Sequence, residues 1–263
     1  MQPAVFVATN GFKVLAFDNL GRRRWENLVR YHKQTKIRAV KETGRLFVVV
    51  GTAYSTPVNV FDGATGRALW HAWEQMGDEM KSTTDYCGLH LTDMLFLDAD
   101  RDGSMEVVFG TKYSRVYALR LKDGATVWQA NVGDEVRCLR SFVDPGSGED
   151  RVAAGTAAGD VILLDRLGRR LARVALASPV AGLEVLPSPE GGSAGLLAAS
   201  DDGRVLAFDA RLDVLGSFDL GRGLRSAAPF GARDGRPVFL LLAERSLHQI
   251  SYIASGTRTS RVH

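Results

Sequence analysis

The chain has 263 residues, of which 45% are apolar and 24% charged, and its formal net charge is +3. This apolar content suffices for a sizeable core in one domain, and no stretch approaches the roughly 20 consecutive apolar residues of a membrane-spanning helix. Two cysteines, Cys87 and Cys138, and an N-terminus without signal-peptide features indicate a reduced, cytoplasmic protein. A processed periplasmic or secreted chain would have a similar sequence.

A repeated unit is the most regular feature of the chain. Copies lie at residues 5–25, 47–70, 107–128, 152–171 and 197–216, with a diverged copy at 239–258. Equivalent positions are Asp18, Asp62, Arg120, Asp165 and Asp209, so that the steps are 44, 58, 45 and 44 residues, and one more step of 44 reaches Ile253. A unit of about 44 residues is typical of a four-stranded propeller blade and not of a helical solenoid.

Each unit predicts the same elements in the same order. A β-branched run leads to a Gly-Thr turn, an alternating apolar run follows, and an Asp-x-x-Gly turn precedes a strand that often begins near Trp. Five units have a further candidate strand before these, at residues 37–40, 89–97, 136–143, 180–186 and 224–230. The first unit begins directly on Val5–Val7, which predicts that one blade lacks its first strand.

Three arrangements remain open for that incomplete blade. The C-terminal stretch GTRTSRVH, residues 256–263, fills the gap, or the blade is left short, or another chain supplies the strand. An unpaired edge strand favours association, so the third arrangement is physically reasonable.

The repeat resembles the blades of PQQ-like (quinoprotein-type) propellers, whose signature runs Gly-Thr-x-x-Gly-x-Val-x-Ala-Leu-Asp-x-x-Thr-Gly-x-x-x-Trp. The stretch GTAYSTPVNVFDGATGRALW at 51–70 is most similar to it, and GTAAGDVILLD at 155–165 matches its first half. The resemblance implies an all-β propeller of about six four-stranded blades, forming a single domain over residues 1–263. Fold does not fix function in propellers, so the function must be argued from the sites.

Aromatic residues recur at one position of the unit. Trp25, Trp70 and Trp128 share a register, and the later units carry Leu171 or Phe218 in their place. Because apolar replacements are tolerated there, we interpret these tryptophans as packing residues between blades and not as a binding surface.

The 58-residue step contains an insertion, which occupies residues 71–92. Insertions in repeat proteins map to loops on one face, which is often the binding face. The candidate partner-binding residues are Trp73, Met76, Tyr86 and His90. The insertion also holds Cys87, but the spacing of its cysteine and histidines does not match a zinc site. The alternative is a long connection without a partner.

Basic residues concentrate between residues 22 and 45, beginning with Arg22, Arg23 and Arg24. Such a region could contact an acidic protein surface or the phosphates of a nucleic acid. No nucleic-acid-binding motif accompanies it, and a solvated face is the third interpretation.

The most specific chemical motif is DADRDGSME, residues 98–106. The carboxylates of Asp98, Asp100, Asp102 and Glu106 and the carbonyl of Ser104 could surround a hard cation, with Gly103 permitting the sharp turn. The motif resembles the Asp-x-Asp-x-Asp-Gly loops of FG-GAP and related calcium-binding propeller blades, which implies a structural Ca²⁺. The alternative is a β-turn whose aspartates accept hydrogen bonds from the backbone without a metal.

No catalytic constellation is recognisable. The five histidines are scattered, no Gly-rich phosphate loop opens a helix, and no PQQ is expected in a chain this short. The sequence therefore predicts a non-catalytic interaction or scaffold propeller, a subunit of a larger complex. A calcium or small-ligand sensor is the alternative, and a small quinoprotein-like enzyme is the third hypothesis.

Overall fold

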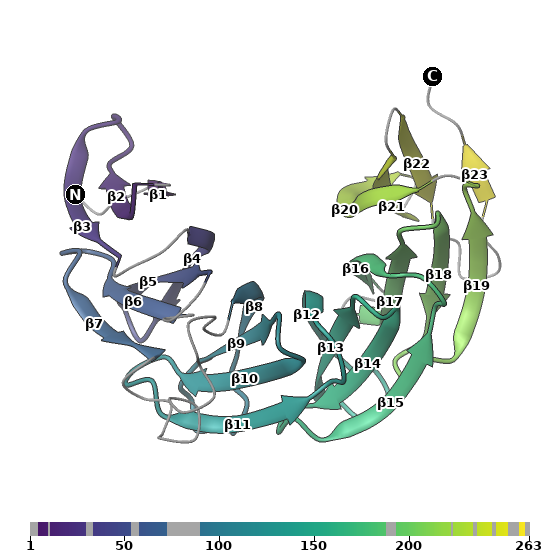
Figure 1. The fold of residues 1–263 in the computed structure, drawn as a ribbon, viewed down its shortest axis with the longest axis horizontal. Coiled ribbons are helices and arrows are strands. Elements are labelled where there is room, and N and C mark those ends of the chain that lie inside the picture. The colour runs from purple at the N-terminus through teal and green to yellow at the C-terminus, as the bar shows by residue number, and fades with distance from the viewer. Residues whose placement is uncertain are drawn as a thin grey trace. The chain divides into compact units, whose positions relative to one another are not determined.

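The computed structural model describes residues 5–9, 11–29, 34–53, 58–72, 90–187, 193–221, 223–233, 236–243, 246–251 and 258–260. The described residues form 23 strands in six antiparallel sheets, drawn in Figure 1. Two compact units, Met1–Gln129 and Ala130–His263, are described separately below.

The first unit contains three sheets. The first sheet consists of β1 (Val5–Ala8), β2 (Lys13–Phe17) and β3 (Arg23–Leu28). The second sheet consists of β4 (Gln34–Glu42), β5 (Arg45–Thr52), β6 (Val58–Asp62) and β7 (Ala68–His71). The third sheet consists of β8 (Leu91–Leu97), β9 (Glu106–Thr111), β10 (Arg115–Arg120) and β11 (Thr126–Asn131), which ends two residues beyond the boundary of the unit.

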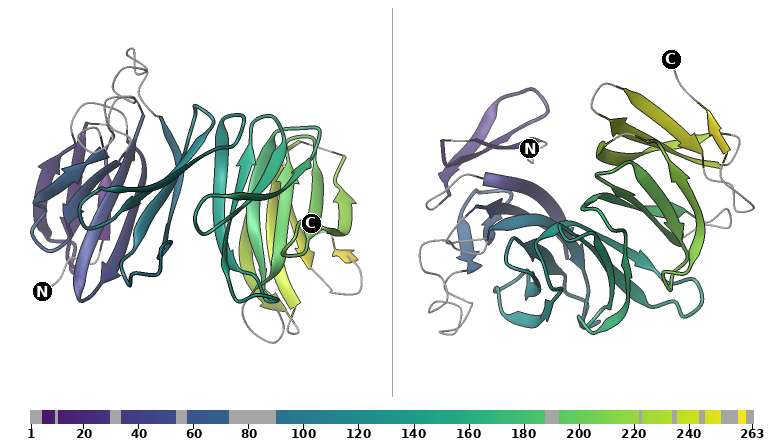
Figure 2. Two further views of the ribbon diagram at one scale, coloured as in Figure 1. Left: turned by 90° about the horizontal axis from the view of Figure 1, so that it is seen from below. Right: turned by 45° about the vertical axis from the view of Figure 1, so that its right-hand side comes forward.

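The second unit contains the other three sheets, which Figure 2 shows in two further views. The fourth sheet consists of β12 (Val136–Val143), β13 (Asp150–Thr156), β14 (Asp160–Asp165) and β15 (Arg170–Ala175). The fifth consists of β16 (Val180–Pro187), β17 (Ser193–Ser200), β18 (Arg204–Phe208) and β19 (Val214–Asp219). The sixth consists of β20 (Leu224–Arg233), β21 (Arg236–Ala243), β22 (Leu247–Ser251) and β23 (Arg258–Ser260).

In every sheet the strands follow one another in chain order, as in the blades of a propeller. The expected extra strand is present in five sheets, and the first sheet has three described strands. Val5 pairs with Phe17 as Val48 pairs with Phe61, so β1 corresponds to the second strand of the four-stranded sheets. The proposal that the C-terminal stretch completes the first blade is wrong for Arg258–Ser260, because these residues pair with β22. That a single domain spans residues 1–263 stays a prediction.

The repeated aspartates cap the turns between the third and fourth strands. Asp18 Oδ1 accepts hydrogen bonds from the N–H groups of Leu20 and Arg22, both at 2.9 Å. Asp165 and Asp209 make the same pair of bonds in their sheets, at 2.8–2.9 Å. An aspartate that bonds its own backbone two residues on stabilises such turns, which accounts for its regular spacing. Ile253, the sixth position of this series, lies outside the described residues.

Two of the recurrent tryptophans, Trp25 and Trp70, pack against the following sheet, as the sequence predicted. Trp25 Nε1 donates to the Gly63 carbonyl at 2.9 Å, and Trp70 Nε1 donates to the Leu121 carbonyl at 2.8 Å, each in the following sheet. A Cβ atom at Gly66 would lie 2.6 Å from the Trp25 ring, so the close approach of this turn requires glycine.

The proposed replacements Leu171 and Phe218 are in the wrong register. Trp25 pairs with Ala16, two residues before the capping aspartate, and Trp70 likewise pairs with Val60. The residues that occupy this position in the fourth and fifth sheets are Ala172 and Gly216. Leu171 is the extra residue of a β-bulge at the start of β15, and the first, second and fifth sheets have a bulge at the corresponding place.

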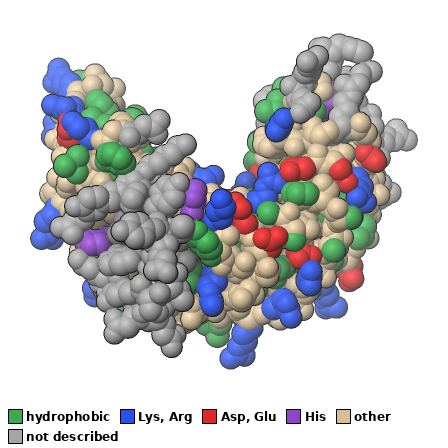
Figure 3. All heavy atoms as spheres, viewed as in Figure 1, with side chains coloured by type: hydrophobic (Ala, Val, Ile, Leu, Met, Phe, Trp, Pro, Cys, Tyr) green, Lys and Arg blue, Asp and Glu red, His purple; other side chains and the backbone are tan. Residues whose placement is uncertain are grey.

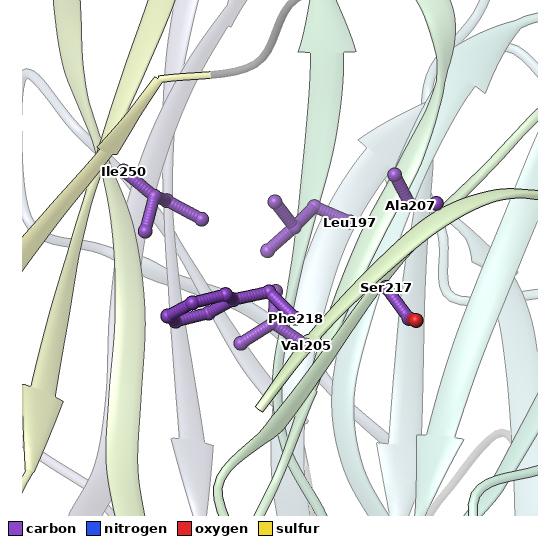
Figure 4. Close-up of a pocket in the computed structure, with 7 residues that line it drawn as sticks. Leu197, Val205, Ala207, Ser217, Phe218 and Ile250 are labelled. Atoms are coloured by element: carbon purple, nitrogen blue, oxygen red, sulfur yellow. The ribbon is translucent and has the colours of Figure 1, made fainter. Parts of the chain in front are cut away.

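An apolar pocket lies beside Gly216, between the fifth and sixth sheets (Figure 4). Its lining consists of Leu197, Val205, Ala207, Gly216, Ser217, Phe218 and Ile250. Ala207 pairs directly with Gly216, the position that tryptophan occupies in the first two sheets. The pocket is therefore the space that the missing side chain would fill, and Phe218 points into it from two residues away.

Candidate metal centre

The acidic loop connects the first two strands of the third sheet. Asp98 follows β8 directly, and Glu106 is the first residue of β9, where it pairs with Leu97. Arg101 and Gly103 have positive φ angles of 63° and 85°, so the loop reverses its course within a few residues. Glycine adopts this conformation without steric cost, as the sequence motif predicted for Gly103.

Three carboxylates of this loop meet. Asp98, Asp100 and Glu106 each offer one oxygen, and the three oxygens lie within 4.8 Å of one another. Glu106 is fully buried, while the other two are partly buried. Like charges this close repel one another, so the arrangement is costly unless a proton or a cation offsets the charge.

Two oxygens of the cluster have no partner within the described residues. Glu106 Oε2 accepts the Ala99 N–H at 2.7 Å, and Asp98 Oδ2 accepts the Gly103 N–H at 3.2 Å. The other oxygens, Glu106 Oε1 and Asp98 Oδ1, are buried without a hydrogen bond. A buried carboxylate oxygen without a partner is energetically unfavourable, so the loop leaves two acceptors for a further group.

Asp102 and Ser104 do not join the cluster of three carboxylates. The Asp102 side chain is exposed, its Oδ1 accepts the Ser104 N–H at 2.7 Å, and its Oδ2 lies 3.9 Å from Arg120 Nε. Asp100 also accepts a backbone bond, from the Asp102 N–H at 3.2 Å. The structure therefore brings together three of the four predicted carboxylates, while Asp102 closes the turn.

The electrostatics of Glu106 follow from its surroundings. The pKa of its carboxyl is raised from 4.5 to about 7, first by burial and then by the negative charges of Asp100, Asp102 and Asp98, against the Ala99 N–H, which lowers it. A divalent cation held by the same oxygens would favour the ionised form and reverse this shift.

In the fourth sheet, the connection between the first two strands has a positively charged residue where the third sheet has Glu106. Arg151 pairs with Asp165 as Glu106 pairs with Arg120, so Arg151 occupies the position of Glu106. Its guanidinium lies 3.1 Å from Asp144, the first residue after β12, and both side chains are largely buried. In the fourth sheet the guanidinium of Arg151 therefore supplies a positive charge next to the aspartate. In the third sheet the same position carries another carboxylate, that of Glu106.

The predicted partner-binding residues divide between described and undescribed parts of the chain. Trp73, Met76 and Tyr86 lie outside the described residues, and His90 is partly buried just before β8. Arg22, Arg23 and Arg24 are exposed at the start of β3. Elsewhere in the basic region, Lys36 lies on β4, the opposite edge strand of the next sheet, and pairs with Asp93 at 3.3 Å, while Arg38, Lys41 and Arg45 are exposed. That the 22–45 region forms one contact surface stays a prediction.

Two groups of residues were missed by the sequence analysis. Glu42, at the end of β4, accepts a hydrogen bond from the N–H of Met105, inside the acidic loop of the next sheet. Nothing in the sequence marks this contact, because 63 residues separate the two. Val5 and Val7 are exposed on β1. The sequence contained a signal for this exposure, because they alternate along a strand next to which no first strand is predicted.

Six sheets of consecutive antiparallel strands, four of them with a turn capped by the repeated aspartate, define a repeat protein of the β-propeller class. More particularly, the chain belongs to the family described as outer membrane protein assembly factor BamB, whose profile matches residues 2–137 and 112–213. This confirms the resemblance to PQQ-like repeats. No curated protein matches the chain. Among the described residues, no helix is long and apolar enough to cross a membrane.

Solved structures with this fold include several propellers of low sequence identity. BBS1N, solved in complex with ARL6DN, has a TM-score of 0.67 at 14% identity, and the match covers 94% of this chain and 73% of that chain. Sqt1 of Saccharomyces cerevisiae has a TM-score of 0.71 at 13% identity, with coverages of 96% and 68%. The designed protein Ika8 has a TM-score of 0.71 at 17% identity, with coverages of 98% and 70%. These similarities concern the fold.

Proposed function

We propose that this chain is a non-catalytic protein-interaction propeller, a subunit of a larger complex. The observation that carries the proposal is the apolar face of the first sheet, defined here by Val5, Val7 and Leu28. Leu28 and Lys13 are cross-strand partners, as are Val7 and Leu15, so this face runs across all three strands. Hydrophobic side chains reach the surface over this sheet, beside basic ones, at the upper left of Figure 3.

An internal comparison shows how unusual this exposure is. Val5 and Val7 are 52% and 39% exposed, whereas Val48 and Val50, their equivalents on β5, are fully buried in the cluster that contains Trp25. The equivalent side of the second sheet is therefore covered by the first sheet. Contiguous exposed apolar surface is typical of interaction sites.

The edge of β1 offers a second way to bind a partner, the addition of a strand to the sheet. In the five other sheets an antiparallel first strand pairs with the strand equivalent to β1, and no described residue does so here. An extended segment with apolar residues at alternate positions would complete the sheet by strand addition. Such a segment would also cover part of the apolar face.

The proposal is tested with the full chain by affinity capture from its native lysate, followed by size-exclusion chromatography with mass determination. We expect a stoichiometric protein partner, and we expect Val7→Asp to abolish its capture while the circular dichroism spectrum is unchanged. Val214→Asp is the matched control, because Val214 is 56% exposed on β19 of the second unit. A monomer with nothing bound, or equal losses in the two variants, would reject the proposal.

A second proposal concerns the acidic loop, which we infer holds a structural divalent cation. The two buried oxygens without partners, Glu106 Oε1 and Asp98 Oδ1, support it. An all-oxygen donor set of carboxylates is typical of hard cations, and Ca²⁺ tolerates the irregular geometry that waters would complete. The position of Arg151 in the fourth sheet supports the same conclusion, because a positive charge is present at the corresponding place.

Calorimetric titration and thermal unfolding test this second proposal. Ca²⁺ should bind with a stoichiometry of one and raise the unfolding temperature, and EDTA should remove the increase. Asp100→Asn should abolish both effects. Asp123→Asn is the control, since Asp123 is an exposed carboxylate of the same sheet and lies outside the cluster. Identical titrations for the two variants would overturn the assignment.

A further inference from the structure

Met105, in the acidic loop, is linked to the second sheet directly through its N–H and indirectly through its carbonyl. The N–H of Met105 donates to Glu42 Oε1 at the end of β4, and the Met105 carbonyl accepts the Leu121 N–H at 2.9 Å. The Leu121 carbonyl in turn accepts Trp70 Nε1 of β7 at 2.8 Å. A hydrogen-bonded series, which we call the Met105 latch, therefore runs from β4 through the third sheet to β7.

Only half of this series is a general feature of the repeat. Between the first and second sheets, Trp25 Nε1 donates to the Gly63 carbonyl, and the Gly63 N–H donates to the Leu46 carbonyl at 2.7 Å. Leu46 is the equivalent of Met105, but it lies inside the β4–β5 ladder opposite Lys41. Asp150, the equivalent in the fourth sheet, likewise lies in a ladder, opposite Val143.

The acidic loop causes this difference. It keeps Met105 out of the β8–β9 ladder, whose described pairing ends at Leu97 and Glu106. The N–H of Met105 is thereby directed to a carboxylate of the neighbouring sheet and not to a strand of its own. The residue that follows Met105 is Glu106, whose buried carboxylate belongs to the proposed cation site.

We propose that cation binding by Asp98, Asp100 and Glu106 closes the Met105 latch and so couples the second sheet to the third; this inference rests on the proposed cation site. Without the cation, repulsion among the three carboxylates favours loop conformations that separate them, and these displace Met105 from Glu42. The bound cation restricts the loop to the conformation in which both bonds of Met105 form. Since the coupling is reciprocal, loss of the Glu42 acceptor weakens cation binding by the same factor.

The affinity test compares two substitutions of Glu42 by calorimetric titration of the full chain with Ca²⁺. We expect Glu42→Ala to weaken binding roughly tenfold, within the usual range of coupling between sites. Glu42→Gln should keep most of the affinity, because its side-chain oxygen still accepts the Met105 N–H. Glu26→Ala is the control, since Glu26 is an exposed carboxylate of the first sheet, paired with Lys13 and Arg23. Equal losses in the Ala and Gln variants would show that only the charge of Glu42 matters and would reject the latch.

A second readout uses the indole protons observed by NMR. Ca²⁺ should slow hydrogen exchange at Trp70 Nε1, whose bond belongs to the latch, and leave Trp25 Nε1 unchanged as an internal control. Equal effects on the two indoles would overturn the inference. Ca²⁺ binding that leaves Trp70 unaffected would reject the latch and retain the cation site, whereas absence of binding to the unmodified chain would reject both.

Discussion

Glu106 is the residue on which the candidate cation site depends, and its ionisation links the site to stability. The folded-state pKa of about 7 exceeds the ordinary value of 4.5. Its contribution to stability is therefore fully present below pH 4.5 and is lost as the pH rises through 7. A shift of this size corresponds to about 3 kcal/mol, which the ion-free protein has lost once the pH exceeds the folded-state pKa.

Glu106→Gln is expected to stabilise the ion-free protein at pH 8, by up to about 3 kcal/mol, because the neutral amide removes the buried charge. The same substitution should abolish the response to Ca²⁺. Denaturant unfolding at pH 8 and pH 5, with EDTA and with Ca²⁺, measures both effects. A variant that is less stable than the unmodified protein in EDTA at pH 8 would show that Glu106 is a purely structural residue.

Asp144 should give the opposite pH dependence. The Ser147 hydroxyl, the Gly146 N–H and Arg151 hold the pKa of this carboxyl below its usual 3.8. Its contribution to stability is therefore present above pH 3.8 and is lost as the pH falls through the lowered value. Asp144→Asn should destabilise the protein by roughly 1–2 kcal/mol at pH 7 and by less near pH 3. Equal losses in urea unfolding at both pH values would contradict this assignment.

At the residue scale, the sequence predicted where the acidic loop lies but not which of its carboxylates come together. The four carboxylates around Gly103 lie within nine consecutive residues, so their spacing alone indicates that they share one loop. Which of them converge depends on side-chain direction, so Asp102 accepts a backbone bond and remains exposed. The role of Arg151 could not be predicted, because its equivalence to Glu106 follows from strand register and not from spacing.

At the scale of elements, the loss of aromatic residues from the later sheets limited what the sequence could predict. The order of the strands and the five first strands were predicted, since apolar runs and capping aspartates recur with the repeat. The tryptophan position was misaligned in the later sheets, because Ala172 and Gly216 occupy it there and neither residue gives an aromatic signal in the sequence. The consequence is physical, since Gly216 leaves a pocket where the first two sheets have an indole ring.

Phe218→Ala should enlarge this pocket and destabilise the protein by about 2 kcal/mol, because a partly buried ring packs there against Ile250 and Val205. Val214→Ala, an exposed position of the same strand, should change stability by less than about 0.5 kcal/mol. The free energies of unfolding in urea provide the comparison. Equal effects of the two substitutions would show that Phe218 does not pack in the pocket.

For the whole molecule, the two compact units differ in how the negative charge is neutralised in the connection between the first and second strands of a sheet. The first unit contains the loop with a buried glutamate, and the second unit contains the loop with an arginine. A cation from solution should therefore act on the first unit alone. At a free concentration 100-fold above the dissociation constant, binding to the folded state contributes about 2.7 kcal/mol.

Hydrogen–deuterium exchange of the full chain, with Ca²⁺ and with EDTA, should locate this effect. Slower exchange is expected in peptides from residues 91–121, which include the loop, β8, β9 and Leu121. The matched peptides from residues 136–165 should be unchanged, because Arg151 already supplies the positive charge there. Asp100→Asn should remove the protection, which separates ion binding from a general effect of salt. Equal protection of both regions would mean that the cation stabilises the chain as a whole and not through the acidic loop.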